Sequence, residues 1–355
     1  MTVGVNQTSE PSNFEYVTAR VRVRKAKLFD DDDYRKLVRM QPNEIARFME
    51  ESEYAEEINR LGARHTGVDL IEYALYDNMS HHFSDIVGWS EGELRELVVS
   101  YLRKYDAWNV KTVLRGVFAG MEPEEIKANL IPAGEFDDHF LEQLVEVDGV
   151  EQVVESLSDT VFGDALEEAL REYEEREVLI PLENAADRVF YQRLVTEDAE
   201  ISDTSPRGLY NDFLKTEIDL LNVRNALRAS GSETVETGDF FIEGGKLFSE
   251  EELTRLVENR EELINALRDS KYGDIAEEAI DELEESGSLV EFDRALDKLL
   301  LDYSQRMTNQ NPLSIAPVIS YILSKEREVN NIRGIARGKE AGLGTEEIEE
   351  EVVIG

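Results

Sequence analysis

The sequence predicts an all-α protein. Apolar residues recur at helical spacing along most of the 355-residue chain, as at Leu94, Leu97, Val98 and Leu102. Alternating patterns typical of strands are nearly absent, and proline and glycine gather in short connectors such as residues 131–134, IPAG. Many helices of ordinary length, joined without a long disordered linker, therefore account for the chain.

The only clear alternating run, residues 17–24 (VTARVRVR), is nevertheless assigned to a helix because it overlaps a motif that recurs along the chain. The motif is an acid followed by asparagine at position +3 and by bases at positions +5 and +9. The N-terminal copy is degraded and consists of Glu15, Thr18, Arg20 and Arg24. The complete copies are Asp106, Asn109, Lys111 and Arg115; Asp219, Asn222, Arg224 and Arg228; and Glu328, Asn331, Arg333 and Arg337.

Two further blocks follow the first three copies. Residues 27–37, 134–144 and 246–256 each contain an apolar anchor, an Asp or Ser N-cap and an acid-rich first turn, where negative charge meets the positive end of the helix dipole. Residues 162–169 and 272–279 each contain an aromatic residue, a glycine and an aspartate that is expected to cap a helix. Residues 54–57 are a weaker version of this last block. The repetition predicts three related helical units.

We assign residues 1–105 to unit 1, residues 106–218 to unit 2 and residues 219–327 to unit 3. The last motif copy has no downstream blocks, so its helix begins a fourth unit that does not continue. Residues 307–324 are uncharged over the length of a membrane span, but eight polar residues and two prolines favour a buried helix of a soluble protein.

The motif residues are predicted to be structural. The asparagine would bond to a neighbouring turn, and the two bases, one helical turn apart, would repel each other unless acids of another helix lie between them. We predict no catalytic residue, no cofactor and no metal site. The chain has no cysteine, the Gly-Lys pairs at residues 245–246 and 338–339 lack the Ser or Thr of a phosphate loop, and the adjacent His81 and His82 point about 100° apart on a helix.

Two alternatives stay open at this point. Asp30 to Asp33 resembles the aspartate-rich signature of helical magnesium-dependent enzymes, although Tyr34 breaks the spacing counted from Asp30. An all-helical metal-dependent enzyme is therefore one alternative, and a generic helical-repeat adaptor is the other.

The formal net charge is −40, from 78 acids and 38 bases. This excess argues against a nucleic-acid-binding protein. The acids are spread along the chain and lysine is scarce, with 12 Lys against 26 Arg. The spread favours adaptation to a salt-rich cytoplasm over a binding face for a basic partner, because molar salt shrinks the Debye length to roughly 3 Å. The N-terminal residues lack the basic start and apolar segment of a signal peptide.

Four segments carry a resemblance to a known family: residues 19–22 (ARVR), 27–29 (KLF), 311–322 (NPLSIAPVISYI) and 325–333 (KEREVNNIR). They resemble the C subunit of archaeal A-type ATP synthase, which is similar to the d subunit of eukaryotic vacuolar ATPases. The resemblance covers nearly the whole chain. It implies an all-α, funnel-shaped protein of three similar domains about a pseudo-three-fold axis, with both chain ends in one domain, so that residues 328–355 would complete unit 1.

The resemblance also implies a function. Such a subunit performs no chemistry and binds no nucleotide. It would be a central-stalk rotor subunit on the cytoplasmic face of the membrane, peripheral to the membrane through the proteolipid ring. Its partners would be that ring and the central shaft, whose lower end it receives in a socket, and it would transmit torque for ATP synthesis or proton pumping.

Overall fold

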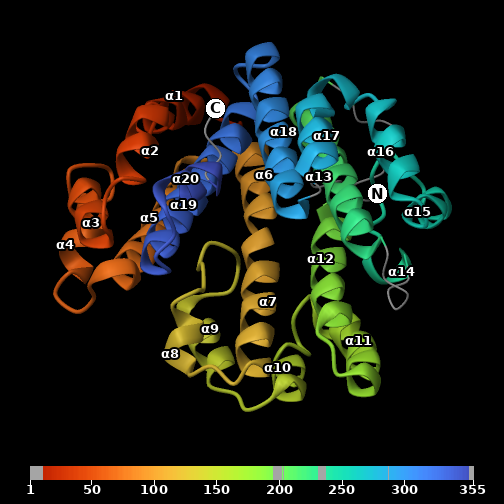
Figure 1. Cartoon of the computed structure of the whole chain (residues 1–355), viewed down its shortest axis with the longest axis horizontal. Helices are drawn as coiled ribbons and strands as arrows, with labels where there is room; N and C mark the ends of the chain where they lie inside the picture. Colours follow the sequence, from red (N-terminus) through yellow and green to blue (C-terminus); the bar gives the residue numbers. More distant parts are fainter. Residues whose placement is uncertain (1–10, 195–201, 203, 231–236, 287, 352–355) are drawn as a thin grey trace, which may run out of the picture.

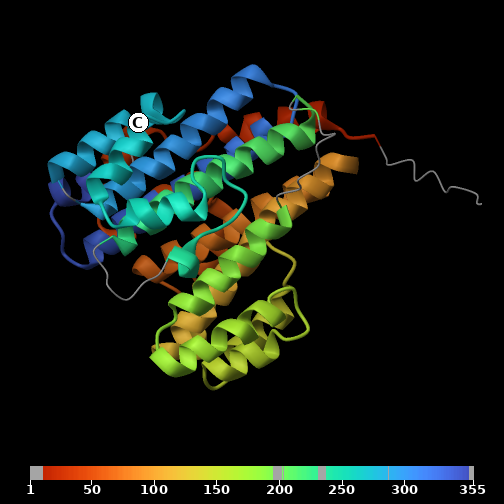
Figure 2. The ribbon, with the colours of Figure 1, turned by 90° about the vertical axis from the view of Figure 1, so that its right-hand side faces the viewer.

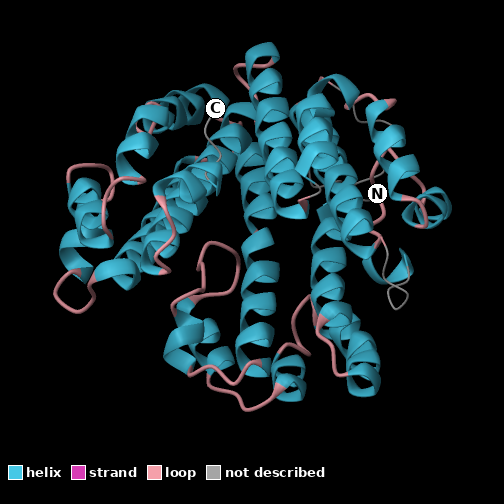
Figure 3. Ribbon diagram, viewed as in Figure 1, coloured by secondary structure: helices cyan, strands magenta, loops and turns pink. Residues whose placement is uncertain are grey.

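The computed structural model describes residues 11–194, 202, 204–230, 237–286 and 288–351. Throughout these residues the regular elements are helices joined by loops and turns, as Figure 3 shows. The prediction of an all-α protein is confirmed.

The first part of the chain forms α1 (Phe14–Lys25), α2 (Asp31–Leu37), α3 (Pro42–Glu50), α4 (Ala55–Leu61), α5 (Gly67–Trp89) and α6 (Gly92–Leu102). Residues 17–24 are helical, as predicted, although their pattern alternates. Val17 and Val21 lie four residues apart and are buried, whereas Arg20, Arg22 and Val23 are exposed. The buried side chains therefore recur with the helical period. The alternation of valine and arginine in the sequence does not correspond to an alternation of buried and exposed positions, since Val23 is exposed.

The middle of the chain forms α7 (Lys104–Phe118), α8 (Pro123–Lys127), α9 (Asp138–Val145), α10 (Val150–Ser156), α11 (Gly163–Arg176) and α12 (Ile180–Leu194). The last part forms α13 (Pro206–Ala229), α14 (Thr237–Phe240), α15 (Glu250–Val257), α16 (Arg260–Arg268), α17 (Gly273–Ser286), α18 (Leu289–Gln310), α19 (Ala316–Glu340) and α20 (Thr345–Glu351).

Short helices form three peripheral groups around long helices that meet near the middle of the molecule (Figure 1). Helices α3 and α4 lie at the left, α8–α10 at the bottom, and α15 and α16 at the right of this view. Figure 2 also places α8–α11 at one end, away from the other two groups. Each group packs on a different long helix: α3 on α5 and α19, α8–α10 on α7, and α15 and α16 on α13.

The buried apolar side chains form two separate clusters. The larger runs from Val17 to Leu214 and resumes from Met307 to Ile348. The smaller consists of residues between Leu220 and Leu299. The predicted unit 3 therefore has a core of its own, whereas the end of the chain packs with the beginning.

The segment 307–324 was expected to be a buried helix, and it is a largely buried helix only from Ala316 onward. Helix α18 ends at Gln310 and α19 begins at Ala316. Pro312 explains the break, because the ring of a proline disfavours helical backbone at the preceding residue, here Asn311. Residues 314–322 are buried. Among the described helices, none combines the length and the apolar character needed to span a membrane.

The N-caps of the repeated second block are confirmed, and those of the third block are not. Asp30, Asp137 and Ser249 each accept a hydrogen bond from the backbone of the first turn of α2, α9 and α15. Asp164 and Asp274 instead lie inside the first turns of α11 and α17. These two helices begin two residues earlier than predicted, because the carbonyl groups of Phe162 and Tyr272 already accept the first helical hydrogen bonds.

Candidate functional site

The acid of each complete motif copy holds the backbone of a loop. In unit 3, Oδ1 of Asp219 accepts hydrogen bonds from the backbone N–H groups of Lys246, at 2.6 Å, and Leu247, at 2.8 Å. The Tyr272 hydroxyl donates to Oδ2 at 2.7 Å, and the Lys271 ammonium lies 3.6 Å from the same atom. Asp219 thus ties the start of the second block and the start of the third block to the middle of α13.

The acid of unit 2 has fewer partners. Asp106 on α7 accepts hydrogen bonds from the backbone N–H groups of Glu135, at 2.9 Å, and Phe136, at 3.0 Å. The position of Tyr272 in the repeat is taken by Phe162, which has no hydroxyl. Gly134 precedes the two donors, and a Cβ atom added there would lie 2.1 Å from Oδ1 of Asp106. Only glycine allows the loop to approach the carboxylate so closely.

The motif acid that binds the loops of the N-terminal part of the chain lies on α19, near the C-terminus. Glu328 on α19 accepts hydrogen bonds from the backbone N–H of Phe29 and the hydroxyl of Tyr54, both at 2.6 Å. The fully buried ammonium of Lys325 lies 2.9 Å from Oε1 of Glu328 and donates to the Tyr54 hydroxyl. Glu15 of the degraded copy is exposed on α1. Glu328 therefore has the role for residues 27–54 that Asp106 and Asp219 have for their own loops.

The motif asparagines also hold turns. Asn109 exchanges two hydrogen bonds with the backbone of Ile131, at 2.8 and 2.9 Å, and Asn222 exchanges two with the backbone of Ile242, both at 2.9 Å. Asn331 forms a side-chain hydrogen bond with Tyr34. All three asparagines are buried. Each asparagine therefore joins its motif helix to a distant segment of the chain.

The motif bases bind acids on a neighbouring helix, the arrangement that their spacing requires. On α7, Lys111 binds Asp187 and Arg115 binds Glu183, both on α12 and both at 2.6 Å. On α13, the counterparts Arg224 and Arg228 both bind Asp293 of α18, and Arg224 also binds Asp297. On α19, Arg333 and Arg337 both bind Glu72 of α5. Each pair of bases therefore fixes its motif helix to one other long helix.

The three motif acids differ in the side chains that surround them. Asp106 is 4% exposed, and desolvation raises its pKa from 3.8 to about 6 against the two backbone hydrogen bonds, which lower it. Glu328 and Asp219 each have a lysine and a tyrosine hydroxyl beside them. Asp106 is the weakly compensated member of the set.

Replacing Phe162 by tyrosine should supply the missing hydroxyl to Asp106. We expect the pKa of Asp106 to fall and the free energy of unfolding at pH 7 to rise by about 1 kcal/mol. In the parent protein Asp106 binds its proton more tightly when folded, so its contribution to stability is fully present below pH 3.8 and is lost as the pH rises through about 6, a loss of up to about 3 kcal/mol. The gain from Phe162→Tyr should therefore grow as the pH is raised from about 5 to about 7.

Urea unfolding in molar KCl at several pH values measures this gain. Phe136→Tyr, at another ring of the same cluster, is the matched control and should show no such pH dependence. A gain that is the same at every pH would contradict the assignment to Asp106.

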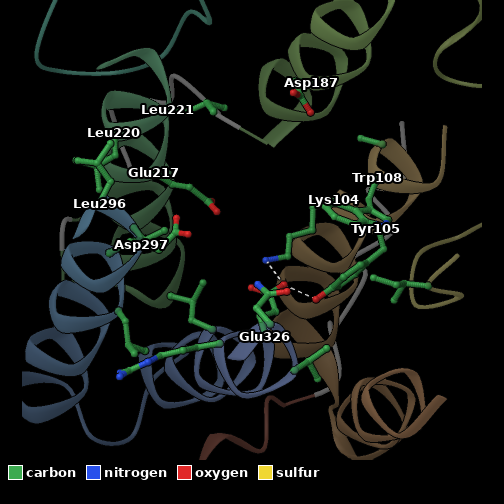
Figure 4. A pocket seen from close by; sticks show the side chains of 18 of the residues that line it. Lys104, Tyr105, Trp108, Asp187, Glu217, Leu220, Leu221, Leu296, Asp297 and Glu326 are labelled. Atoms are coloured by element: carbon green, nitrogen blue, oxygen red, sulfur yellow. Dashed lines mark hydrogen bonds and ion pairs between the residues drawn. The ribbon is translucent and has the colours of Figure 1, made fainter. Parts of the chain in front are cut away.

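The long helices enclose a cavity of about 350 Å³ where they meet (Figure 4). Equivalent positions of all three complete motif copies line it. The residues at position −2 are Lys104, Glu217 and Glu326; those at +1 are Ala107, Leu220 and Val329; and those at +2 are Trp108, Leu221 and Asn330. Position −2 lies about 200° around a helix from the motif acid. Each motif helix therefore holds its own loop on one face and contributes to the common cavity with the other.

The residues at position −2 form a hydrogen-bonded group. The Lys104 ammonium lies 2.5 Å from Oε1 of Glu326, which also accepts a hydrogen bond from Tyr105. Lys104 donates to the Tyr101 hydroxyl, which in turn donates to Oε1 of Glu217 at 3.1 Å. The pKa of Glu217 is raised to about 7, because burial and the nearby Glu326 raise it more than Lys104, the Tyr101 hydroxyl and Arg224 lower it. These residues are not predicted from the sequence, because position −2 carries a different residue type in different copies of the motif. Only its place on the helix face opposite the motif acid could have indicated it.

The features considered as metal or catalytic sites have other roles. The Asp30 side chain caps α2, and Asp32 and Asp33 bind Arg35 and Lys36 on the same helix. Nδ1 of His82 lies 2.6 Å from the Tyr321 hydroxyl, and burial lowers the pKa of His82 to about 2. Within the described residues, no group of three or more His, Asp or Glu side chains is arranged to hold a metal ion.

Comparison with known proteins gives a consistent result. Residues 17–351 match the model of a family described as ATP synthase (C/AC39) subunit. The chain is 54% identical to the C subunit of the A-type ATP synthase of Halorubrum lacusprofundi, over 97% of this chain and 98% of that protein. It is 53% identical to the protein of the same name from Haloferax volcanii, over 98% and 99% of the two chains. It is 35% identical to that from Archaeoglobus fulgidus, over 96% of each.

Proposed function

The chain belongs to the ATP synthase (C/AC39) subunit family, and from this premise we propose that it is the non-catalytic rotor subunit of an A-type ATP synthase that joins the central shaft to the membrane proteolipid ring. The observation that carries the proposal is the cavity lined by equivalent positions of three motif helices. Such a cavity at the meeting point of the long helices suits a socket for the end of a shaft. It also supports an arrangement of three units about a pseudo-three-fold axis, with residues 328–355 completing unit 1.

A subunit that transmits torque must resist twisting between its units. The three motif acids tie the loops of each unit to a long helix, and the motif bases tie each of these helices to a second one. Helix α19 adds a long-range closure, because it packs on α18 and also on α1 and α5. Load applied to one unit would therefore be shared by the others. We place the protein at the cytoplasmic face of the membrane, bound through the ring.

Assembly tests the proposal. The full chain should co-purify with the proteolipid ring and the central shaft from cells in molar salt. Leu221→Glu puts a charge at the cavity and should abolish retention of the shaft, whereas Val290→Glu, at a side chain 59% exposed at the start of α18, should not. Failure of the wild-type chain to co-purify, with the rest of the complex intact, would exclude the proposed function.

We further propose that the acidity of the chain is an adaptation to salt. A net charge of −40 produces strong self-repulsion in a folded chain, and only concentrated counterions screen it at the short distances between surface carboxylates. We expect the thermal midpoint of unfolding to fall steadily as KCl is lowered from molar to millimolar concentration. The check is circular dichroism at constant pH, with sucrose at matched osmolarity as the control. A midpoint independent of KCl would contradict this adaptation.

A further inference from the structure

The wall of the cavity carries five bases and four acids, but the three side chains at position −2 have an excess of one acid. The three side chains at position −2 of the motif copies are one base, Lys104, and two acids, Glu217 and Glu326. Lys104 is paired with Glu326. Elsewhere on the wall, Lys111 pairs with Asp187 and Arg224 with Asp297, and Lys298 and Arg327 are two further bases.

Glu217 is the cavity carboxylate without an ionic partner among the described residues. Its Oε1 atom accepts one hydrogen bond, from the Tyr101 hydroxyl, and its buried Oε2 atom has no hydrogen-bond partner. Figure 4 shows the Glu217 side chain leaving α13 and pointing into the space between α7, α12 and α19. A carboxylate has room for about four hydrogen bonds, so most of its accepting capacity is unused.

We propose that Glu217 anchors a cationic side chain, lysine or arginine, carried by the subunit that fills this cavity. The inference rests on the proposed function and specifies the chemistry of the partner at the same site. A single positive charge would balance the group formed by Lys104, Glu217 and Glu326. Leu220, Leu221 and Trp108 offer apolar and aromatic surface for the aliphatic stem of such a side chain.

The surroundings of Glu217 make this binding dependent on pH. Besides Lys104 and Glu326, the charged or titratable groups near Glu217 are Tyr101, Tyr105, Tyr191, Tyr210 and Arg224. The wall also carries Asp187, Asp297, Lys111, Lys298 and Arg327. A proton competes with the incoming cation for Glu217, whose pKa burial raises to about 7. Raising the pH from about 6 to about 8 should therefore strengthen cation binding by up to about tenfold.

A small probe measures the chemistry of the cavity directly. The chain has two tryptophans, and Trp108 lines the cavity, so a Trp89→Phe background leaves Trp108 as the reporter of occupancy. N-butylguanidinium should alter the Trp108 fluorescence in molar KCl and bind more tightly than the neutral N-butylurea. Glu217→Gln should weaken butylguanidinium binding by about fivefold or more and remove its pH dependence. Glu167→Gln, at an exposed acid of α11, is the matched control and should leave both unchanged.

Three results would overturn the inference: butylguanidinium binding no tighter than butylurea, binding unaffected by Glu217→Gln, or binding that does not depend on pH. The assembled complex separates this inference from the proposed function. If the wild-type chain retains the shaft and Glu217→Gln retains it with the same affinity, the cationic anchor is wrong and the socket stands. If the wild-type chain does not retain the shaft, the proposed function is wrong.

Discussion

Replacing Glu328 by alanine is expected to lower the free energy of unfolding by about 3–5 kcal/mol. The change leaves the ammonium of Lys325, which is 0% exposed, without its counter-charge. It also removes the acceptor of the Phe29 backbone N–H and of the Tyr54 hydroxyl. A buried unpaired charge is among the most costly defects in a protein core, and here it coincides with two lost hydrogen bonds.

Chemical denaturation in molar KCl measures the effect, with Asn330→Ala, at an exposed position on the same helix, as the matched control. The double variant Lys325→Met with Glu328→Gln separates the two causes. Removing both charges leaves no ion without a partner, so the double variant should be more stable than Glu328→Ala. A loss below about 1 kcal/mol for Glu328→Ala would mean that Lys325 finds another partner or water.

Glu328→Ala also tests whether the C-terminal residues belong to the same unit as the N-terminal residues. Glu328 joins α19 to a loop and a helix near the N-terminus, almost three hundred positions earlier in the sequence. If residues 328–355 complete unit 1, the loss of Glu328 should expose the backbone of α2–α4 to hydrogen exchange before that of α15–α17. Unprotected amides spread evenly over the molecule would argue against this assignment.

The helical class and the repeat were accessible from the sequence because both are periodic. Buried positions such as Val17 and Val21 recur with the helical period, and the motif keeps its spacing on every copy. The pairing of Lys111 and Arg115 with acids of another helix also followed from local geometry, since two bases one turn apart require a counter-charge. Contacts that depend on residues three or four positions apart on one helix can thus be predicted from the sequence.

Contacts between distant segments were less accessible. The resemblance to a known family implied that the two chain ends share a domain, but no local pattern pairs Glu328 with Phe29 and Tyr54. The group around Glu217 was missed because its members belong to different helices and differ in charge. The break at Asn311, by contrast, has a local signal in the Pro312 that follows it.

Each of the three motif acids is a buried carboxylate that binds the backbone of a loop, but the side chains that stabilise its charge differ. Glu328 is compensated by a fully buried lysine and a tyrosine, Asp219 by a partly exposed lysine and a tyrosine, and Asp106 by two backbone amides and the charge of Arg103. The geometry of the loop is kept in each unit, while the electrostatic compensation declines from Glu328 to Asp106. The raised pKa of Asp106 is the consequence of that decline. The repeat therefore provides an internal comparison in which the cost of a buried carboxylate varies on one scaffold.

Asp219→Ala is expected to lower the free energy of unfolding more than the equivalent substitution Asp106→Ala. Asp219→Ala removes the acceptor of the Lys246 and Leu247 backbone N–H groups and of the Tyr272 hydroxyl, and we expect a loss of about 3–4 kcal/mol. Asp106→Ala removes only two hydrogen bonds and also a carboxylate that burial penalises, so its loss at pH 7 should be about 1–2 kcal/mol.

The location of the damage provides a sharper test than its size. Asp219 joins the loop at Leu247 to α13. Helix α13 contributes Leu220 and Val223 to the smaller apolar cluster, which is separate from the rest of the core. Asp219→Ala should therefore raise hydrogen exchange in α15–α17 well before α5 and α19 lose protection, as expected of a unit that opens on its own. Equal losses for the two alanine variants, or simultaneous exchange throughout the molecule, would show that the units unfold as one body and that the carboxylates do not act locally.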